Sequence, residues 1–444
     1  MNRTLLNLAL TAALLAVTAS GVYSKNFPAG PSQSKELMTP AATDSAAVKD
    51  LLDEALNQGK DAKSRCAAIT SLGASRNETV LLALAGAVMD ADTGVRVCAS
   101  RMAGETKNAQ SVNFLLTNVR SYLNSSGSDK NAVNARLAAI NSIWSLGEIG
   151  NSAVLTDLVK FYKASDDTLK INNLISMGKL TGNADAAPFI KGVAASPRET
   201  EAVRAAAFEM LEELGQSASI TDLAPSLSAG IADGDILFAG GLTGDITSWV
   251  SPDLPVGHAG IFAGAEIKNG RIYVKIGDCV PNFFTPGGVR NVSAWKNFTH
   301  LFKYPYYGNR TSKPAPTPAQ RNKIVELSIE MGEKGLHYDI THISQKGPVE
   351  FDCVGYSEYI YEAVGLNPTD NSYETGLGWP LTPWEQFAGT VPSTTPAPSH
   401  AGAIPFRITA EPPLAAIETL KKGLFGEAAK LLEAPAMITP AKAD

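Results

Sequence analysis

The chain has 444 residues, with 38 Lys and Arg against 44 Asp and Glu, which gives a net charge of −6. Neutralising nucleic-acid phosphates requires a basic surface, so this balance argues against a nucleic-acid partner. The hydrophobic content of 44% is ordinary for a globular protein. The length allows two or three domains, each with a core of its own.

The N-terminus has the pattern of a secretory signal peptide. An uncharged apolar run, residues 5–17, follows Arg3 and is too short to span a bilayer comfortably. Small residues follow between Ala19 and Ser24. We therefore expect residues 1–24 to direct the protein to the periplasm or outside the cell, the alternative being an uncleaved anchor. No other apolar run is long enough to predict a stable membrane span.

Composition divides the rest of the chain. Residues 25–44 form a leader with Pro and Ser, and residues 45–230 contain few prolines and aromatic residues. Both residue types become frequent in residues 231–390. Residues 391–444 begin as a Pro- and Ala-rich linker and contain an amphipathic pattern at 414–432 that predicts a helix. The predicted domains follow these boundaries.

Residues 45–230 contain a degenerate repeat. Short amphipathic segments with small residues recur, and each ends at a glycine: Gly73, Gly104, Gly147, Gly178 and Gly215. A second predicted helix follows most of them, as at 78–89 and 152–163. This pattern predicts an all-α solenoid of helix pairs and resembles HEAT-type repeats. We expect each glycine to take a left-handed conformation at a helix end. Such an array serves as a platform for a substrate or protein partner, or as a spacer.

The four cysteines are too few for a disulfide-dependent scaffold. Cys66 and Cys98 occupy near-equivalent places in adjacent repeats, so either a disulfide or two small buried thiols fits them. The cysteine spacings match no zinc pattern and the sequence has no HExxH motif. We therefore expect neither a metal nor another cofactor.

The pattern after residue 230 changes to strands. Short β-rich runs broken by glycine, 233–240, 257–264 and 270–278, predict an antiparallel sheet with one buried face. A helix is predicted at 318–333, and another begins after the sequence Phe-Asp-Cys at 351–353. The second part is therefore an α+β domain.

Cys353 stands at the predicted start of the last of these helices, with Asp352 as its cap. The positive end of a helix macrodipole and free backbone N–H groups favour a thiolate, which attacks carbonyl groups. His258 opens a predicted strand and is the preferred base, ahead of the remaining candidates His300, His337 and His342. A disulfide between Cys279 and Cys353 is the alternative that would abolish thiol chemistry.

These residues carry a family resemblance. The Phe-Asp-Cys helix resembles the nucleophile helix of NlpC/P60 cysteine peptidases, and the segment 257–264 resembles their histidine strand. Because the histidine precedes the cysteine, the chain resembles the circularly permuted branch of this papain-like superfamily, over residues 231–390. Further matches are Gly234 with Asp235, Gly288 with Val289, and Gly335 with Tyr338 and Asp339.

One feature departs from the family pattern. The family usually places a polar residue, often His or Glu, late in the strand after the catalytic histidine, where it orients the imidazole. This sequence has Val274 and Lys275 there. Asp278 is the nearest carboxylate and our candidate orienting residue. Tyr338 either lines the substrate site or is a structural aromatic residue.

The resemblance implies a secreted cysteine hydrolase that cleaves amide bonds, with peptidoglycan stem peptides as the expected substrate. Permuted relatives also act on lipid esters and amides, so an acyl hydrolase or transferase is one alternative. A catalytically inactive binding or scaffold protein is another. We expect the repeats to serve as a binding platform and the segment 231–390 to fold and react without them.

Overall fold

A computed structural model of the chain describes residues 45–73, 75, 77–125, 130–180, 185–216, 230–240, 255–281, 287–339, 347–369 and 381–393. The predicted signal peptide, leader and C-terminal helix lie outside these residues. Across the described segments, no helix is both long enough and apolar enough to cross a membrane. From Lys49 onward the chain forms one compact unit.

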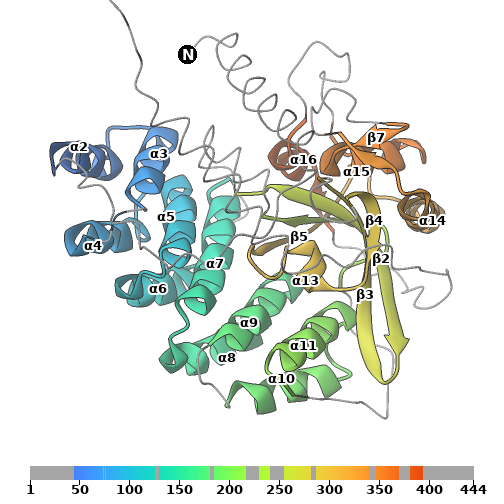
Figure 1. Cartoon of the computed structure of the whole chain (residues 1–444), viewed down its shortest axis with the longest axis horizontal. Coiled ribbons are helices and arrows are strands. Elements are labelled where there is room, and N and C mark those ends of the chain that lie inside the picture. The colour runs from blue at the N-terminus through green and yellow to red at the C-terminus, as the bar shows by residue number, and fades with distance from the viewer. Residues whose placement is uncertain are drawn as a thin grey trace, which may run out of the picture. The chain divides into compact units, whose positions relative to one another are not determined.

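The first part is helical and built of helix pairs, as predicted (Figure 1). Its helices are α2 (Ser45–Leu56), α3 (Ala62–Leu72), α4 (Glu78–Ala87), α5 (Thr93–Glu105), α6 (Val112–Leu123), α7 (Lys130–Ile149), α8 (Leu155–Lys163), α9 (Asp167–Lys179), α10 (Ala186–Ala195) and α11 (Glu201–Glu213). Helices α3, α5, α7, α9 and α11 contact one another in succession. The helix predicted at 78–89 ends two residues early, and the one at 152–163 begins with a 3₁₀ turn, Ser152–Val154.

The repeat glycines have a different role from the predicted one. Of the five, only Gly215 has a positive φ, of 66°. The others lie where one helix crosses the next. A Cβ atom at Gly104 would come within 2.4 Å of Ser145 Oγ, and one at Gly147 within 2.7 Å of Ser176 Cα. Close helix approach, and not a left-handed helix end, therefore requires glycine at these crossings.

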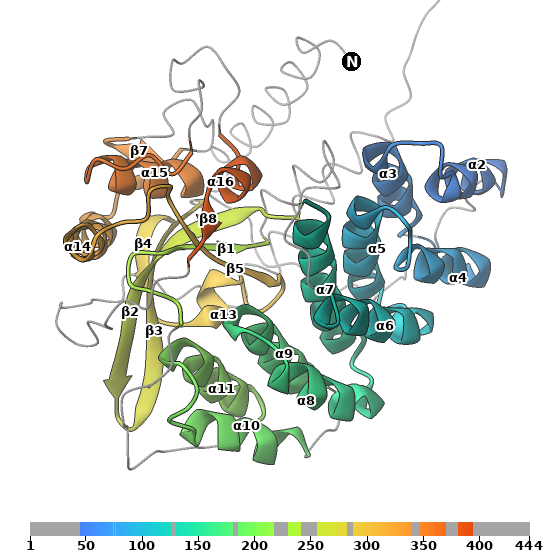
Figure 2. The same ribbon diagram turned by 180° about the vertical axis from the view of Figure 1, so that it is seen from behind.

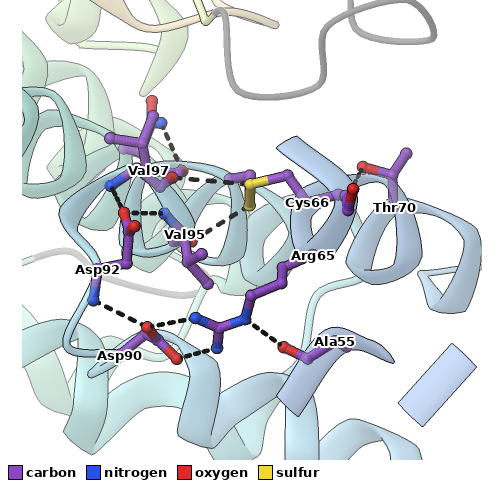
Figure 3. The surroundings of a disulfide bond; sticks show 12 residues. Ala55, Arg65, Cys66, Thr70, Asp90, Asp92, Val95 and Val97 are labelled. Carbon is purple, nitrogen blue, oxygen red and sulfur yellow. Dashed lines mark hydrogen bonds and ion pairs between the residues drawn. A yellow bond between two sulfur atoms is a disulfide. The ribbon is translucent and has the colours of Figure 1, made fainter. Parts of the chain in front are cut away.

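A disulfide links the first two repeats. Cys66 in α3 and Cys98 in α5 are bonded, with Cα atoms 5.9 Å apart (Figure 3). Beside it, the buried Arg65 donates through Nε to Ala55 O at 3.0 Å and through Nη1 to Asp90 Oδ1 at 2.9 Å. The disulfide thus joins α3 to α5, while Arg65 links α3 to α2 by a hydrogen bond and to the turn before α5 by an ion pair. Disulfides persist mainly in proteins of oxidising compartments.

The second part is α+β, as predicted. Six strands form one antiparallel sheet in the order β4-β3-β2-β1-β5-β8. They are β1 (Ile236–Ala239), β2 (His258–Lys268), β3 (Arg271–Val280), β4 (Gly288–Val292), β5 (Tyr306–Thr311) and β8 (Val391–Pro392). A second, two-stranded sheet pairs β6 (His337–Tyr338) with β7 (Glu350–Phe351). The three predicted strands are β1, β2 and β3.

Helices α14 (Pro318–Lys334) and α15 (Cys353–Glu362) pack against the strands of the larger sheet (Figure 2). Gly277 in β3 makes room for them, because a Cβ atom there would lie 2.1 Å from Ser328 Oγ and 2.2 Å from Tyr356 Oη. These two hydroxyl groups are hydrogen-bonded to each other at 2.7 Å. The contact fixes α15, and hence Cys353, relative to β3. Helices α13 (Trp295–Phe298) and α16 (Pro383–Gly389) complete this part.

The helical and sheet parts share a buried interface. Trp295 and Tyr306 are both fully buried. Trp295 Nε1 donates to Ala202 O of α11 at 2.9 Å. Asn172 of α9 donates to Tyr306 O at 2.7 Å and accepts from its backbone N–H at 3.1 Å. This interface argues against our expectation that the segment 231–390 folds without the repeats.

Candidate functional site

The preferred base, His258, opens β2 and faces a carboxylate on the next strand. Its Nε2 lies 3.1 Å from Oδ2 of Asp278 in β3. In the β2–β3 register Asp278 pairs with Gly260, two residues along from the histidine and therefore on the same face of the sheet. Both side chains are buried. The structure thus brings together the two residues that we selected as base and orienting group.

Arg290 holds the carboxylate in turn. It lies directly opposite Asp278 in the β3–β4 register. Its Nε donates to Oδ1 at 2.7 Å and its Nη2 to Oδ2 at 3.0 Å, a two-pronged geometry that fixes the carboxylate plane. Burial by itself raises the pKa of Asp278, but Arg290 and His258 outweigh it and hold the pKa below its usual range. Asp278 is therefore an anion at neutral pH.

Cys353 is the first residue of α15, and Asp352 caps this helix as predicted. The Asp352 Oδ1 atom accepts from the backbone N–H of Gly355 at 2.6 Å. The thiol lies within electrostatic reach of β2 and β3, since the backbone of Ala259 and the charge of Asp278 both influence its pKa. Helix α15, which begins at Cys353, packs on β2 and β3, the two strands that carry His258 and Asp278.

The protonation state of the thiol differs from the expected one. Cys353 is only 3% exposed, and this burial raises its pKa above its usual range. The negative charge of Asp352 acts in the same direction, while hydrogen bonds from the backbone of Ala259 and Cys353 act against it. Desolvation outweighs the helix N-terminus at this position, so the resting nucleophile is a neutral thiol. A nucleophilic role for this thiol would therefore require a base that removes its proton.

His258 has one ring nitrogen available for this task. Because Asp278 is ionised and acceptor-only, it favours the tautomer in which Nε2 carries the proton and donates to the carboxylate. Nδ1 is then the ring nitrogen whose lone pair can accept a proton.

The alternative disulfide is not formed. Cys279 and Cys353 are both free and buried. The Cys279 thiol instead donates to the carbonyl oxygen of Phe351 at 3.2 Å. Burial raises its pKa well above the usual range. Cys279 is thus a protonated thiol next to the strand that leads into the nucleophile helix.

The other candidate bases are in different positions. His337 is exposed in β6, and His342 lies outside the described residues. His300 is buried, and its ring centroid lies 5.2 Å from that of His258. Burial lowers the pKa of His300 well below its usual range, and His258 adds to this. His300 is therefore a neutral neighbour of the base.

Tyr338 lies near the nucleophile, as its proposed role at the substrate site requires. It is buried in β6 and pairs in register with Phe351, two residues before Cys353. Burial raises the pKa of Tyr338 well above its usual range, and the neighbouring Cys353 contributes. The phenol is therefore neutral. Its position suits either contact with substrate or packing under the nucleophile.

Sequence reasoning missed Arg290. The available signal was a charged residue between two valines in a short strand-like run, Gly288–Val292, that follows the predicted strand ending at Asp278. Such a residue is rarely buried without a partner of opposite charge. Among the residues that the structure describes, no group of three or more His, Cys, Asp and Glu could hold a metal ion. Comparisons of the sequence with protein-family models and with curated proteins found no match.

Proposed function

We propose that the protein is a thiol hydrolase in which Cys353 is the nucleophile, His258 the general base and Asp278 the orienting carboxylate. The observation that carries this proposal is the buried chain from Arg290 through Asp278 to His258 Nε2 beside the first residue of α15. With Nε2 engaged by Asp278, Nδ1 is the nitrogen that takes the proton of the Cys353 thiol in this proposal. A structural histidine has no comparable requirement for an ionised, doubly anchored carboxylate.

The proposed reaction has two steps. Nδ1 of His258 takes the proton of the Cys353 thiol as sulfur attacks the substrate carbonyl, and backbone N–H groups at the start of α15 stabilise the developing oxyanion. The imidazolium returns the proton to the leaving amine, which leaves a thioester on Cys353. Water activated by the same imidazole then hydrolyses the thioester, releasing the acid and restoring the thiol.

The finer assignment follows the resemblance described above. The sheet, the nucleophile helix and the His-before-Cys order support a permuted NlpC/P60 domain of the papain-like superfamily. The successive helix pairs support HEAT-type repeats that act as a binding platform. The apolar N-terminal segment and the disulfide support a secreted or periplasmic location. Peptidoglycan stem peptides are then the proposed substrate, and lipid esters or amides the alternative.

One observation favours a second candidate, a catalytically inactive binding protein. Both Cys353 and His258 are buried, and the thiol pKa is raised. A buried, protonated thiol is a poor nucleophile unless the base acts on it directly. In this second candidate function, the buried contacts around His258 and Cys353 only stabilise the fold, and the helical part recognises a partner.

Alkylation and substrate assays separate these readings. The purified full chain is incubated with iodoacetamide at pH 7, and mass spectrometry identifies which cysteine is modified. Preferential alkylation of Cys353 over Cys279, lost in His258→Ala, supports the thiol hydrolase. Release of peptides from purified sacculi, against release of fatty acid or amine from lipid vesicles, then identifies the substrate class. Equal and slow alkylation of both thiols, with neither substrate cleaved, favours the binding protein.

A further inference from the structure

The turn that carries His300 has a backbone conformation that few residues adopt. His300, Leu301 and Phe302 have φ angles of 50°, 63° and 59°, so three consecutive residues other than glycine are left-handed. Side chains with a Cβ atom rarely enter this region, and almost never in succession. Such a conformation persists only where surrounding contacts determine it.

The segment Trp295–Tyr304 supplies the surroundings of the base. The ring of Phe298, in α13, lies 5.0 Å from the ring of His258, and the ring of His300 lies 5.2 Å from it. Tyr304 in turn lies edge-on to His300 at 5.7 Å. The position of the imidazole of His258 therefore depends on the conformation of this segment.

The helical part holds the end of the left-handed turn. The carbonyl oxygen of Phe302 accepts from Lys179 Nζ of α9 at 2.5 Å and from Trp144 Nε1 of α7 at 3.4 Å. Lys179 also lies over the Trp144 ring, 5.6 Å from its centroid, and is paired with Glu148. Two successive repeats thus hold one carbonyl group of the turn.

The beginning of the same segment is held by a third repeat. The carboxylate of Glu209 in α11 accepts from the backbone N–H groups of Trp295 and Lys296, each at 2.8 Å. These are the first two residues of α13, whose free N–H groups need acceptors. The segment is therefore clamped at both ends by the helical part.

From these contacts we infer that the helical part sets the position of His258 through the left-handed turn, with Trp144 and Lys179 as positioning residues. The inference deepens the proposed function, since it makes the repeats part of the machinery that orders the base. A ligand that alters the packing of α7 on α9 would then change the site from a distance. The repeats are more than a platform in this view.

The other end of the same helix, α9, offers a matched control. Lys170 of α9 pairs with Glu199 at 2.7 Å and lies over the ring of Tyr162 at 5.3 Å, the same combination of ion pair and cation–π contact. Lys170→Met therefore removes an equivalent interaction without a bond to the turn. Lys179→Arg keeps an N–H donor and tests for rescue.

The test uses the full chain with ¹⁵N-labelled histidine. The chain has five histidines, so imidazole signals are few and can be assigned by single substitutions. We expect Lys179→Met and Trp144→Phe to shift the ¹⁵N signals of His258 and His300 and their titration, and Lys170→Met to leave them unchanged. Lys179→Arg should restore most of the original spectrum. The melting temperature, measured alongside, shows that the variants are folded.

Activity provides the second measurement. If the chain is a hydrolase, Lys179→Met should lower kcat on a small substrate about tenfold or more with KM nearly unchanged, as expected when a base is misplaced by a fraction of an ångström. Unchanged His258 signals in folded Lys179→Met and Trp144→Phe would overturn the inference. Shifted signals in a chain that hydrolyses nothing would support it and refute only the proposed function.

Discussion

His258 Nε2 lies 3.1 Å from Asp278 Oδ2, across two neighbouring strands of the sheet. This pairing assigns separate roles to the two nitrogens of the imidazole. Because Asp278 is held by Arg290 and remains ionised, it determines which nitrogen is protonated and leaves Nδ1 as the acceptor. The predictions below start from this arrangement.

Replacement of Cys353 by Ala or Ser should abolish hydrolysis and leave the fold intact. Only a thiolate is a strong nucleophile, and a serine hydroxyl beside the same base stays protonated. Turnover on the identified substrate and near-UV circular dichroism check the two parts. The matched control is Cys279→Ser, which keeps a donor to Phe351 O and should retain activity. Undiminished turnover in Cys353→Ala would end the thiol-hydrolase proposal.

Removal of the base should have a smaller but still large effect. We expect His258→Ala to lower kcat about 10² to 10⁴ fold, the usual contribution of a general base. His337 is exposed in β6, so His337→Ala is the control and should stay near wild-type activity. The opposite result, with loss in His337→Ala alone, would move the base from β2 to β6.

Asp278→Asn should reduce both activity and stability. The amide cannot fix the Nε2–H tautomer, and it leaves the buried Arg290 without its anion, which typically costs about 3 to 5 kcal/mol. The lowered pKa of Asp278 means that its contribution is present at neutral pH and is lost as the pH falls below about 3.8. Urea unfolding at pH 7 and pH 3 should therefore show a larger difference between wild type and variant at pH 7. Equal differences at both pH values would contradict this account.

The sequence was sufficient for the local elements but not for their contacts. Strands β1 to β3 and helix α14 follow from hydrophobic periodicity. The cap of α15 follows from Asp352, whose side chain can accept from backbone N–H groups. The link from His258 to Asp278 depends on strand register, which local patterns do not specify. The roles of Trp144 and Lys179 depend on a contact across more than a hundred residues. The prediction that the repeat glycines end helices in a left-handed conformation was wrong for four of the five. Both a left-handed helix end and close packing of two helices require glycine, so the sequence alone does not distinguish them.

Glu209 should make stability depend on pH in the neutral range. Burial raises its pKa to about 8, although two backbone N–H groups favour the charged form. The folded state then holds a proton that the unfolded state releases, so the free energy of unfolding should fall as the pH rises from about 4.5 to about 8. Glu209→Gln should show a flatter pH dependence in urea unfolding. A variant curve parallel to that of the wild type would show that Glu209 is ionised throughout.

A fragment of residues 231–390 should fail to fold on its own, contrary to what composition suggests. Without the helical part, Trp295 and Tyr306 lose their burial against α11 and α9, and each large aromatic side chain exposed to water costs about 2 to 3 kcal/mol. The left-handed turn also loses both donors to Phe302 O. Since domains are stable by only about 5 to 15 kcal/mol, these losses together remove most of the margin.

The control for this truncation is a fragment of residues 45–393, which keeps the helical part and removes only the termini. We expect it to give a cooperative urea transition and near-UV circular dichroism like that of the full chain, whereas 231–390 should give neither. Because residues 231–390 also lack β8, a fragment of residues 231–393 is measured in parallel, and its comparison with 45–393 isolates the loss of the interface. A fragment 231–390 that unfolds cooperatively and whose Cys353 is alkylated at the full-chain rate would mean that the sheet part orders the base without help. The repeats would then be a platform only, and the contacts at Phe302 would be dispensable for the site.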